Sequence, residues 1–152
     1  MAIETFKATT IHPGHGTKVR IVARQHEIIS DEPEELNGTD TGANPVELLL
    51  GALGACQSVV AQVYAEKFGI SFNELRIELE GDLDLDGFLD AADVRSGYSE
   101  IRVKYHLKSE ASEERIAAFI EYLNDHCPVG DTIANSVNLI ARDFVVHAPE
   151  FA

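Results

Sequence analysis

The sequence is poor in cationic residues and in cysteine, and it contains no tryptophan. Among its 152 residues, 12 Lys and Arg face 26 Asp and Glu, which gives a net charge of −14. A chain this acidic repels phosphate backbones and anionic lipid surfaces, so nucleic acids and membranes are not expected partners. The longest apolar run, residues 48–56, is too short to span a bilayer. The N-terminus lacks the charged and apolar regions of a signal peptide, which predicts a cytoplasmic location.

The cysteine content is limited to Cys56 and Cys127, and no Cys-x-x-Cys motif occurs. Because the cytoplasm keeps thiols reduced, these residues are expected to be free thiols, redox-active thiols or packing residues rather than a permanent disulfide. The sequence also lacks a phosphate-binding loop, a dinucleotide fingerprint and a Gly-x-Ser-x-Gly motif. A structural zinc site is therefore not expected, and no motif for a nucleotide cofactor is present.

The hydrophobic pattern predicts one α+β domain over residues 1–152. Alternating residues and turn signals predict an N-terminal group of strands at 3–10, 18–24 and from 28, with a turn at 12–16 and a loop at 31–43. Strands at 75–85 and 100–107 are expected to pair antiparallel across a loop at 86–99. Further elements are a helix from Ser112 to about 124, a short helix from about 127 and a closing strand at 143–147.

The strongest helix signal begins at Asn44. Pro45 suits the first helical position, and Glu47 lies three residues after Asn44, as in a capping box. The helix is expected to run from 45 to about 67 and to end at Gly69. Its apolar residues lie on nearly every side, which predicts burial on most sides, and Gly51 and Gly54 predict very close packing against it.

The two cysteines have different expected surroundings. Cys56 lies in the middle of the long helix, where the helix dipole has little effect, so a reactive thiol there requires a nearby cation. The alternative is that Cys56 is a small buried apolar residue. Cys127 precedes Pro128, so its thiol is expected at the start of a helix, either as an activated thiol or as a capping and packing residue.

Residues 82–93 suggest a calcium loop. Acidic residues occupy the first, third, fifth, ninth and twelfth positions, and Gly87 the sixth. However, the preceding residues alternate as a strand, whereas an EF-hand needs a helix there. A solvent-exposed hairpin is the favoured interpretation, and calcium binding is the alternative.

The segments Gly42-Ala-Asn-Pro-Val-Glu-Leu-Leu-Leu-Gly-Ala-Leu-Gly-Ala-Cys56 and Cys127-Pro-Val-Gly-Asp-Thr132 together resemble the OsmC/Ohr family of osmotically inducible and organic hydroperoxide resistance proteins. The resemblance extends over essentially the whole chain. It implies an intertwined α+β homodimer with the cysteine-bearing helices at its centre and active sites at the subunit interface.

The resemblance also implies the chemistry of a thiol peroxidase. Cys56 matches the peroxidatic cysteine, which attacks an organic hydroperoxide and becomes a sulfenic acid, and Cys127 matches the resolving cysteine. A dithiol, such as a lipoyl group, would reduce the resulting disulfide. Neither metal nor flavin is required.

Two positions depart from the hydroperoxide resistance branch. Val46 follows the Asn-Pro pair in place of an acid, and Glu47 comes one residue later. The activating arginine of that branch falls near Lys18, with Arg20 and Arg24 close by. Arg20 is the preferred cation for Cys56, with Glu47 as its orienting carboxylate. The chain therefore resembles a general OsmC-like branch.

Two main functions follow from these observations. The first is a dimeric, cysteine-dependent reductase of organic hydroperoxides in oxidative-stress defence. The alternative is a weakly active or non-enzymatic OsmC-like protein that binds a small hydrophobic ligand at the dimer interface.

Overall fold

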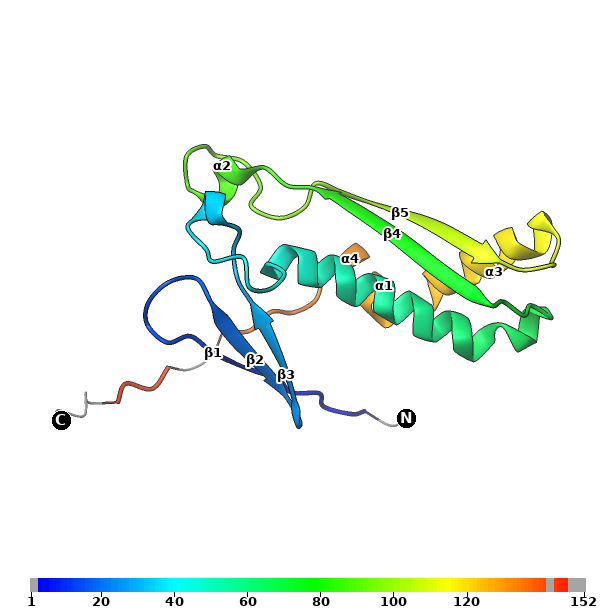
Figure 1. The fold of residues 1–152 in the computed structure, drawn as a ribbon, viewed down its shortest axis with the longest axis horizontal. Coiled ribbons are helices and arrows are strands. Elements are labelled where there is room, and N and C mark those ends of the chain that lie inside the picture. The colour runs from blue at the N-terminus through cyan, green and yellow to red at the C-terminus, as the bar shows by residue number, and fades with distance from the viewer. Residues whose placement is uncertain (1–2, 142–143, 148–152) are drawn as a thin grey trace.

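The computed structural model describes residues 3–141 and 144–147 and contains two antiparallel sheets and one long helix (Figure 1). The N-terminal sheet has the order β1-β2-β3, and the second sheet is a β4-β5 hairpin. The elements, in chain order, are β1 (Thr9–Ile11), β2 (Val19–Ala23), β3 (His26–Ser30), the 3₁₀ turn η1 (Glu34–Leu36), α1 (Pro45–Tyr64), the 3₁₀ turn η2 (Glu66–Phe68), β4 (Glu74–Asp82), α2 (Leu85–Phe88), β5 (Glu100–Lys108), α3 (Glu113–Asp125) and α4 (Pro128–Ala134). The predicted α+β class is confirmed.

The main core forms around α1, which packs against β4, α3 and α4. Val60 and Ala61 of α1 lie in one buried cluster with Phe119 and Leu123 of α3. Ala65, which caps the end of α1, and Ile70, which follows η2, also belong to this cluster. Burial of these apolar side chains is the main favourable contribution to folding in this part of the chain.

The ends of the helices follow the capping signals in the sequence. The Asn44 side chain accepts a hydrogen bond from the Glu47 N–H, and the Glu47 carboxylate accepts one from the Asn44 N–H, so the predicted capping box is confirmed. Ser112 caps α3, also as predicted. Gly69 has a φ of 60°, the left-handed conformation that glycine favours, and it ends η2.

The predicted pairing of the second hairpin is confirmed, with Glu74 opposite Lys108 and Asp82 opposite Glu100. Alternation places Leu75, Ile77 and Leu79 on the inner face, where α1 covers the strand.

Several predicted boundaries are wrong. Residues 3–8 form no strand, and β1 comprises only Thr9–Ile11. Helix α1 ends at Tyr64, and the last predicted turn is the separate 3₁₀ turn η2. Strand β4 ends at Asp82 because the side chain of Asp84 caps the short helix α2, in a segment predicted to be loop. Residues 144–147 form no strand within this chain, and residue 143 lies outside the described residues.

The two glycines of α1 have different surroundings. Gly54 is buried, and a Cβ atom there would lie 2.8 Å from the Leu79 Cδ1 atom of β4. Gly51 faces open space, with no atom within 4 Å of such a Cβ position. The predicted close packing is therefore found on the side of Gly54 within this chain.

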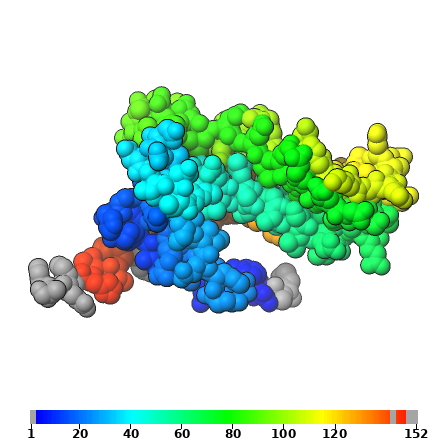
Figure 2. Space-filling view, in the orientation of Figure 1, coloured from blue at the N-terminus to red at the C-terminus, as the bar shows by residue number. Residues whose placement is uncertain are grey.

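The outward side of α1 remains uncovered. Figure 2 shows this helix along the surface between the N-terminal strands and the β4-β5 hairpin. Val59 and Val63 are 64% and 65% exposed. Helix α1 is long and apolar enough to cross a membrane, judged by its length and composition alone. The shorter apolar run 48–56 within it is too short to do so. A core helix of a water-soluble protein passes the same test, and α1 has buried contacts on its other sides.

The N-terminal sheet stands apart from the α1 core and is joined to it by the loop at 31–43 (Figure 1). Asp31 organises this loop from a position that is 1% exposed. Its carboxylate accepts hydrogen bonds from the hydroxyls of Thr17, Thr39 and Thr41. These bonds, chiefly that from Thr39, hold the pKa of Asp31 well below its ordinary value of 3.8, against the opposing effect of burial.

We expect this loop to become less stable in acid. A carboxyl with a lowered pKa in the folded protein stabilises the fold above its unfolded-state pKa, and this stabilisation is lost as the pH falls toward the folded-state value. Denaturant unfolding of the wild type between pH 7 and pH 3 should show declining stability below about pH 4. Asp31→Asn should be less stable at pH 7 and less sensitive to acid, and Asp40→Asn, on the exposed part of the loop, is the matched control. An Asp31→Asn profile parallel to that of the wild type would contradict this role.

Candidate active site

Cys127 lies at the start of α4, as its position before Pro128 predicted. Its side chain caps the helix, with Sγ accepting a hydrogen bond from the Gly130 N–H at 3.3 Å. The residue is only 1% exposed. Burial raises the pKa of the Cys127 thiol, whereas the N–H groups of Gly130 and Val129 act to lower it.

Cys56 lies in the part of α1 that packs near α4 and is only partly buried. Its side chain interacts with that of Cys127, and this interaction is a further cause of the raised pKa of Cys127. The fold therefore brings together two thiols that are far apart in the sequence. Neither cysteine forms a disulfide in the structure.

A polar network adjoins the cysteine pair. The Gln57 Nε2 atom donates a hydrogen bond to Asn124 Oδ1 at 3.1 Å, and the Tyr105 hydroxyl donates to the same atom at 2.8 Å. Burial raises the pKa of Tyr105, and the nearby Cys127 side chain is the second cause of this rise. The network thus connects α1, β5 and the end of α3 beside Cys127.

The predicted activating pair, Arg20 and Glu47, is not brought together within one chain. The Arg20 guanidinium forms an ion pair with Glu27 at 2.7 Å across the β2-β3 hairpin, and both side chains are exposed. The Glu47 carboxylate caps α1. Lys18 and Arg24 flank β2 and are also exposed. The fold places Arg20 in β2 of the N-terminal sheet and the other two cations at the ends of this strand, whereas Cys56 lies in α1.

The acidic segment 82–93 does not form a calcium loop. Asp82 accepts two hydrogen bonds from Arg102, at 2.6 and 2.8 Å, and Asp84 caps α2. Among residues 3–141 and 144–147, no group of three or more His, Cys, Asp or Glu side chains is arranged to hold a metal ion. The hairpin interpretation is the one that the structure supports.

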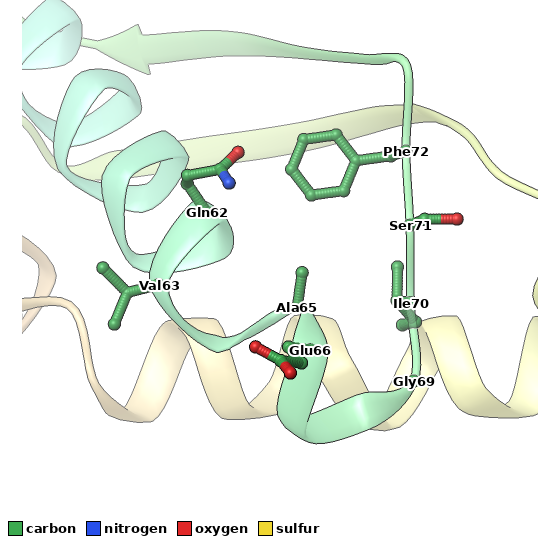
Figure 3. Close-up of a pocket in the computed structure, with 8 residues that line it drawn as sticks. All are labelled: Gln62, Val63, Ala65, Glu66, Gly69, Ile70, Ser71 and Phe72. Atoms are coloured by element: carbon green, nitrogen blue, oxygen red, sulfur yellow. The ribbon is translucent and has the colours of Figure 1, made fainter.

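A hollow of about 450 Å³ opens beyond the C-terminal end of α1, near η2 (Figure 3). Gln62 and Phe72 extend into it from opposite sides, and Ile70 lies at its wall. Its lining contains neither Cys56 nor Cys127, so it is separate from the thiol pair.

The residues of the polar network were not among the site residues predicted from the sequence. Gln57 gave a signal, because it is an amide within an apolar helix and directly follows Cys56. Asn124 and Tyr105 gave none, since their role depends on contacts with residues far away in the chain.

The family model for OsmC-like proteins matches residues 38–141 of this chain. That region includes both cysteines, Gln57, Tyr105 and Asn124. The Arg20 region lies before the matched residues.

Similar proteins have been identified in two mycoplasmas. The chain is 27% identical over 97 residues to a hydroperoxide reductase of Mycoplasma genitalium and 29% identical over 98 residues to one of Mycoplasma pneumoniae. These matches cover 64% and 62% of this chain, and they span 66% and 64% of the relatives' lengths. A solved OsmC-like protein from Mycoplasma pneumoniae has the same fold, with a TM-score of 0.75 at 24% identity over 86% of this chain and 88% of the other.

We expect the pKa of Cys127 to depend on Cys56. Alkylation of Cys127 in the folded wild type should reach half its maximal rate at a higher pH than in the same protein unfolded in guanidinium, because burial disfavours the thiolate. In Cys56→Ala this midpoint should move to lower pH, because the Cys56 side chain that helps to raise the pKa of Cys127 is absent. Peptide mass spectrometry of iodoacetamide-treated samples measures both profiles. A midpoint that is unchanged in the variant would show that the two thiols do not interact.

Proposed function

Because the chain belongs to the OsmC-like protein family, we propose that it reduces organic hydroperoxides with Cys56 and Cys127. The observation that carries this proposal is the contact between the two thiols across α1 and α4. Such a pair can store the two oxidising equivalents of one peroxide as a disulfide. The name hydroperoxide reductase of the two mycoplasma relatives supports the same chemistry.

In this proposal Cys56 is the peroxidatic residue, because it is more accessible than Cys127. Its thiolate attacks the terminal oxygen of the hydroperoxide, the O–O bond breaks, and the alkoxide leaves as an alcohol after taking up a proton. The product is a Cys56 sulfenic acid. Cys127, as thiolate, then attacks the Cys56 sulfur, and the hydroxyl leaves as water to form the disulfide.

A dithiol partner, in the form of a lipoyl protein, completes the cycle by thiol–disulfide exchange. The whole cycle takes place in the cytoplasm. The cation that favours the Cys56 thiolate comes from Lys18, Arg20 or Arg24, with Arg20 preferred, and Glu47 orients it. Since these residues do not meet Cys56 within one chain, the cation is supplied by a second copy.

The functional unit in this proposal is a homodimer. Val59 and Val63 leave an apolar strip on α1. Further exposed apolar side chains lie on β3, at Ile28 and Ile29, and at Phe144 near the C-terminus. A second copy would cover these surfaces, whose exposure to water is unfavourable in a free monomer.

The redox proposal is tested with one equivalent of cumene hydroperoxide. We expect loss of both thiols and an intramolecular Cys56–Cys127 disulfide, measured by mass spectrometry, and turnover when a dithiol is added. Cys127→Ser should react once at Cys56 and then progress to sulfinic acid in excess peroxide, because no thiol remains to trap the sulfenic acid.

Cys56→Ser serves as the matched control and should consume no peroxide beyond the background. An unreacted Cys56 in folded wild-type protein would refute the peroxidase proposal. Binding of a small hydrophobic ligand at the dimer interface would then be the function left to test.

We expect a stable dimer at micromolar concentration, measured by light scattering. Val59→Glu combined with Val63→Glu should shift the protein toward monomer or make it less soluble, because two charges would enter an apolar contact. Lys104→Glu, on the exposed face of β5, is the control and should leave the dimer mass measured by light scattering unchanged. A well-folded monomer of the wild type under these conditions would contradict the proposal.

A further inference from the structure

Gln57 has an unusual feature for a buried side chain. It is 3% exposed, and its Oε1 atom has no hydrogen-bond partner within the part of the chain that the structure describes. The other end of the same amide is bonded to Asn124 Oδ1. Buried polar atoms in folded proteins are nearly always paired, because an unpaired one loses its hydrogen bond to water without a replacement.

The position of Gln57 relates this free atom to the thiol pair. Gln57 directly follows Cys56 on α1, and its bonded end shares Asn124 with Tyr105. Tyr105 in turn lies near enough to Cys127 for that thiol to raise the pKa of the tyrosine. The unpaired amide atom thus belongs to the residue next to Cys56, and the same amide is bonded to Asn124, which also binds Tyr105.

The network holds the Gln57 amide in place through one end but leaves its other end without a hydrogen bond. The Asn124 Oδ1 atom already accepts from both Gln57 and Tyr105, which leaves the outer end of the Gln57 amide free. Turning both amides over would preserve the bond between them and would leave the Gln57 N–H group free at the same place. Either way, one polar group of the Gln57 amide is left without a partner, and it can bond to an oxygen that bears a hydrogen.

We propose that Gln57 binds the O–H group that an organic hydroperoxide delivers to Cys56. This inference rests on the proposed function and adds a substrate-binding residue to it. The same O–H group is present in two successive species. It is the terminal O–H of the hydroperoxide before attack, and it becomes the O–H of the Cys56 sulfenic acid once the O–O bond has broken.

This hydrogen bond assists both steps without any covalent change at Gln57. Before attack, it orients the terminal oxygen toward the Cys56 sulfur. After attack, it holds the sulfenic hydroxyl while the Cys127 thiolate approaches the Cys56 sulfur, and the hydroxyl then takes up a proton and leaves as water. The amide therefore gains its missing partner only when the reaction is under way.

The test compares two reagents that attack the same thiol. Gln57→Met has a similar size but lacks the amide, and it should react with cumene hydroperoxide about tenfold more slowly than the wild type, the loss expected for one hydrogen bond. Iodoacetamide carries no hydroperoxide O–H, so its rate with Cys56 should be unchanged. Gln25→Met, which makes the same substitution in the exposed turn of the β2-β3 hairpin, should match the wild type with both reagents.

A second readout follows the sulfenic acid. In excess hydroperoxide, Gln57→Met should yield a larger fraction of Cys56 sulfinic acid and less disulfide than the wild type. If Gln57→Met fails to fold, Gln57→Asn keeps a carboxamide but withdraws it by one methylene, and the same pattern is expected.

The outcomes separate this inference from the proposed function. Equal slowing with both reagents, or wild-type rates and products with the hydroperoxide, would mean that Gln57 has a structural role only and would overturn the inference. A wild-type protein that alkylates at Cys56 but does not react with hydroperoxide would refute the proposed function itself.

Discussion

Helix α1 is apolar on nearly all sides, and the rest of the structure is arranged to cover it. Strand β4, α3 and α4 cover its inner sides, and Gly54 permits the close approach of β4. This packing positions the site, because it places Cys56 near the start of α4. The outer side is left apolar and exposed, at Val59 and Val63, which is the basis for proposing a second copy there.

Burial has opposite consequences for the different groups of the site. It protects Cys127 from solvent and raises its pKa, so this thiol is poorly suited to attack peroxide first. The same environment makes the free end of the Gln57 amide a strong hydrogen-bonding group, because water does not compete for it. A partly accessible first thiol, a buried second thiol and a fixed amide form a consistent arrangement for a reaction in two steps.

The cations proposed to activate Cys56 lie in or beside β2 of the N-terminal sheet, outside the α1 core. The connection of this sheet to that core is the loop that Asp31 ties together through threonine hydroxyls. Within one chain, Arg20 is paired with Glu27 on the surface of this sheet. An activating role for Arg20 therefore requires it to exchange this exposed pairing, worth less than about 1 kcal/mol, for a contact with another copy.

The sequence by itself determined the features that depend on neighbours within a few residues. The capping box of Asn44 and Glu47, the start of α4 at Cys127 and the alternation of the β4-β5 hairpin are local, so their patterns could be read directly. The proximity of Cys56 and Cys127 was expected only through the family resemblance. Tertiary structure alone decided that Gln57 meets Asn124 and Tyr105, and that Arg20 pairs with Glu27 rather than Glu47. Such contacts join residues on different elements, and they are set by how helices and strands pack, which no local pattern encodes.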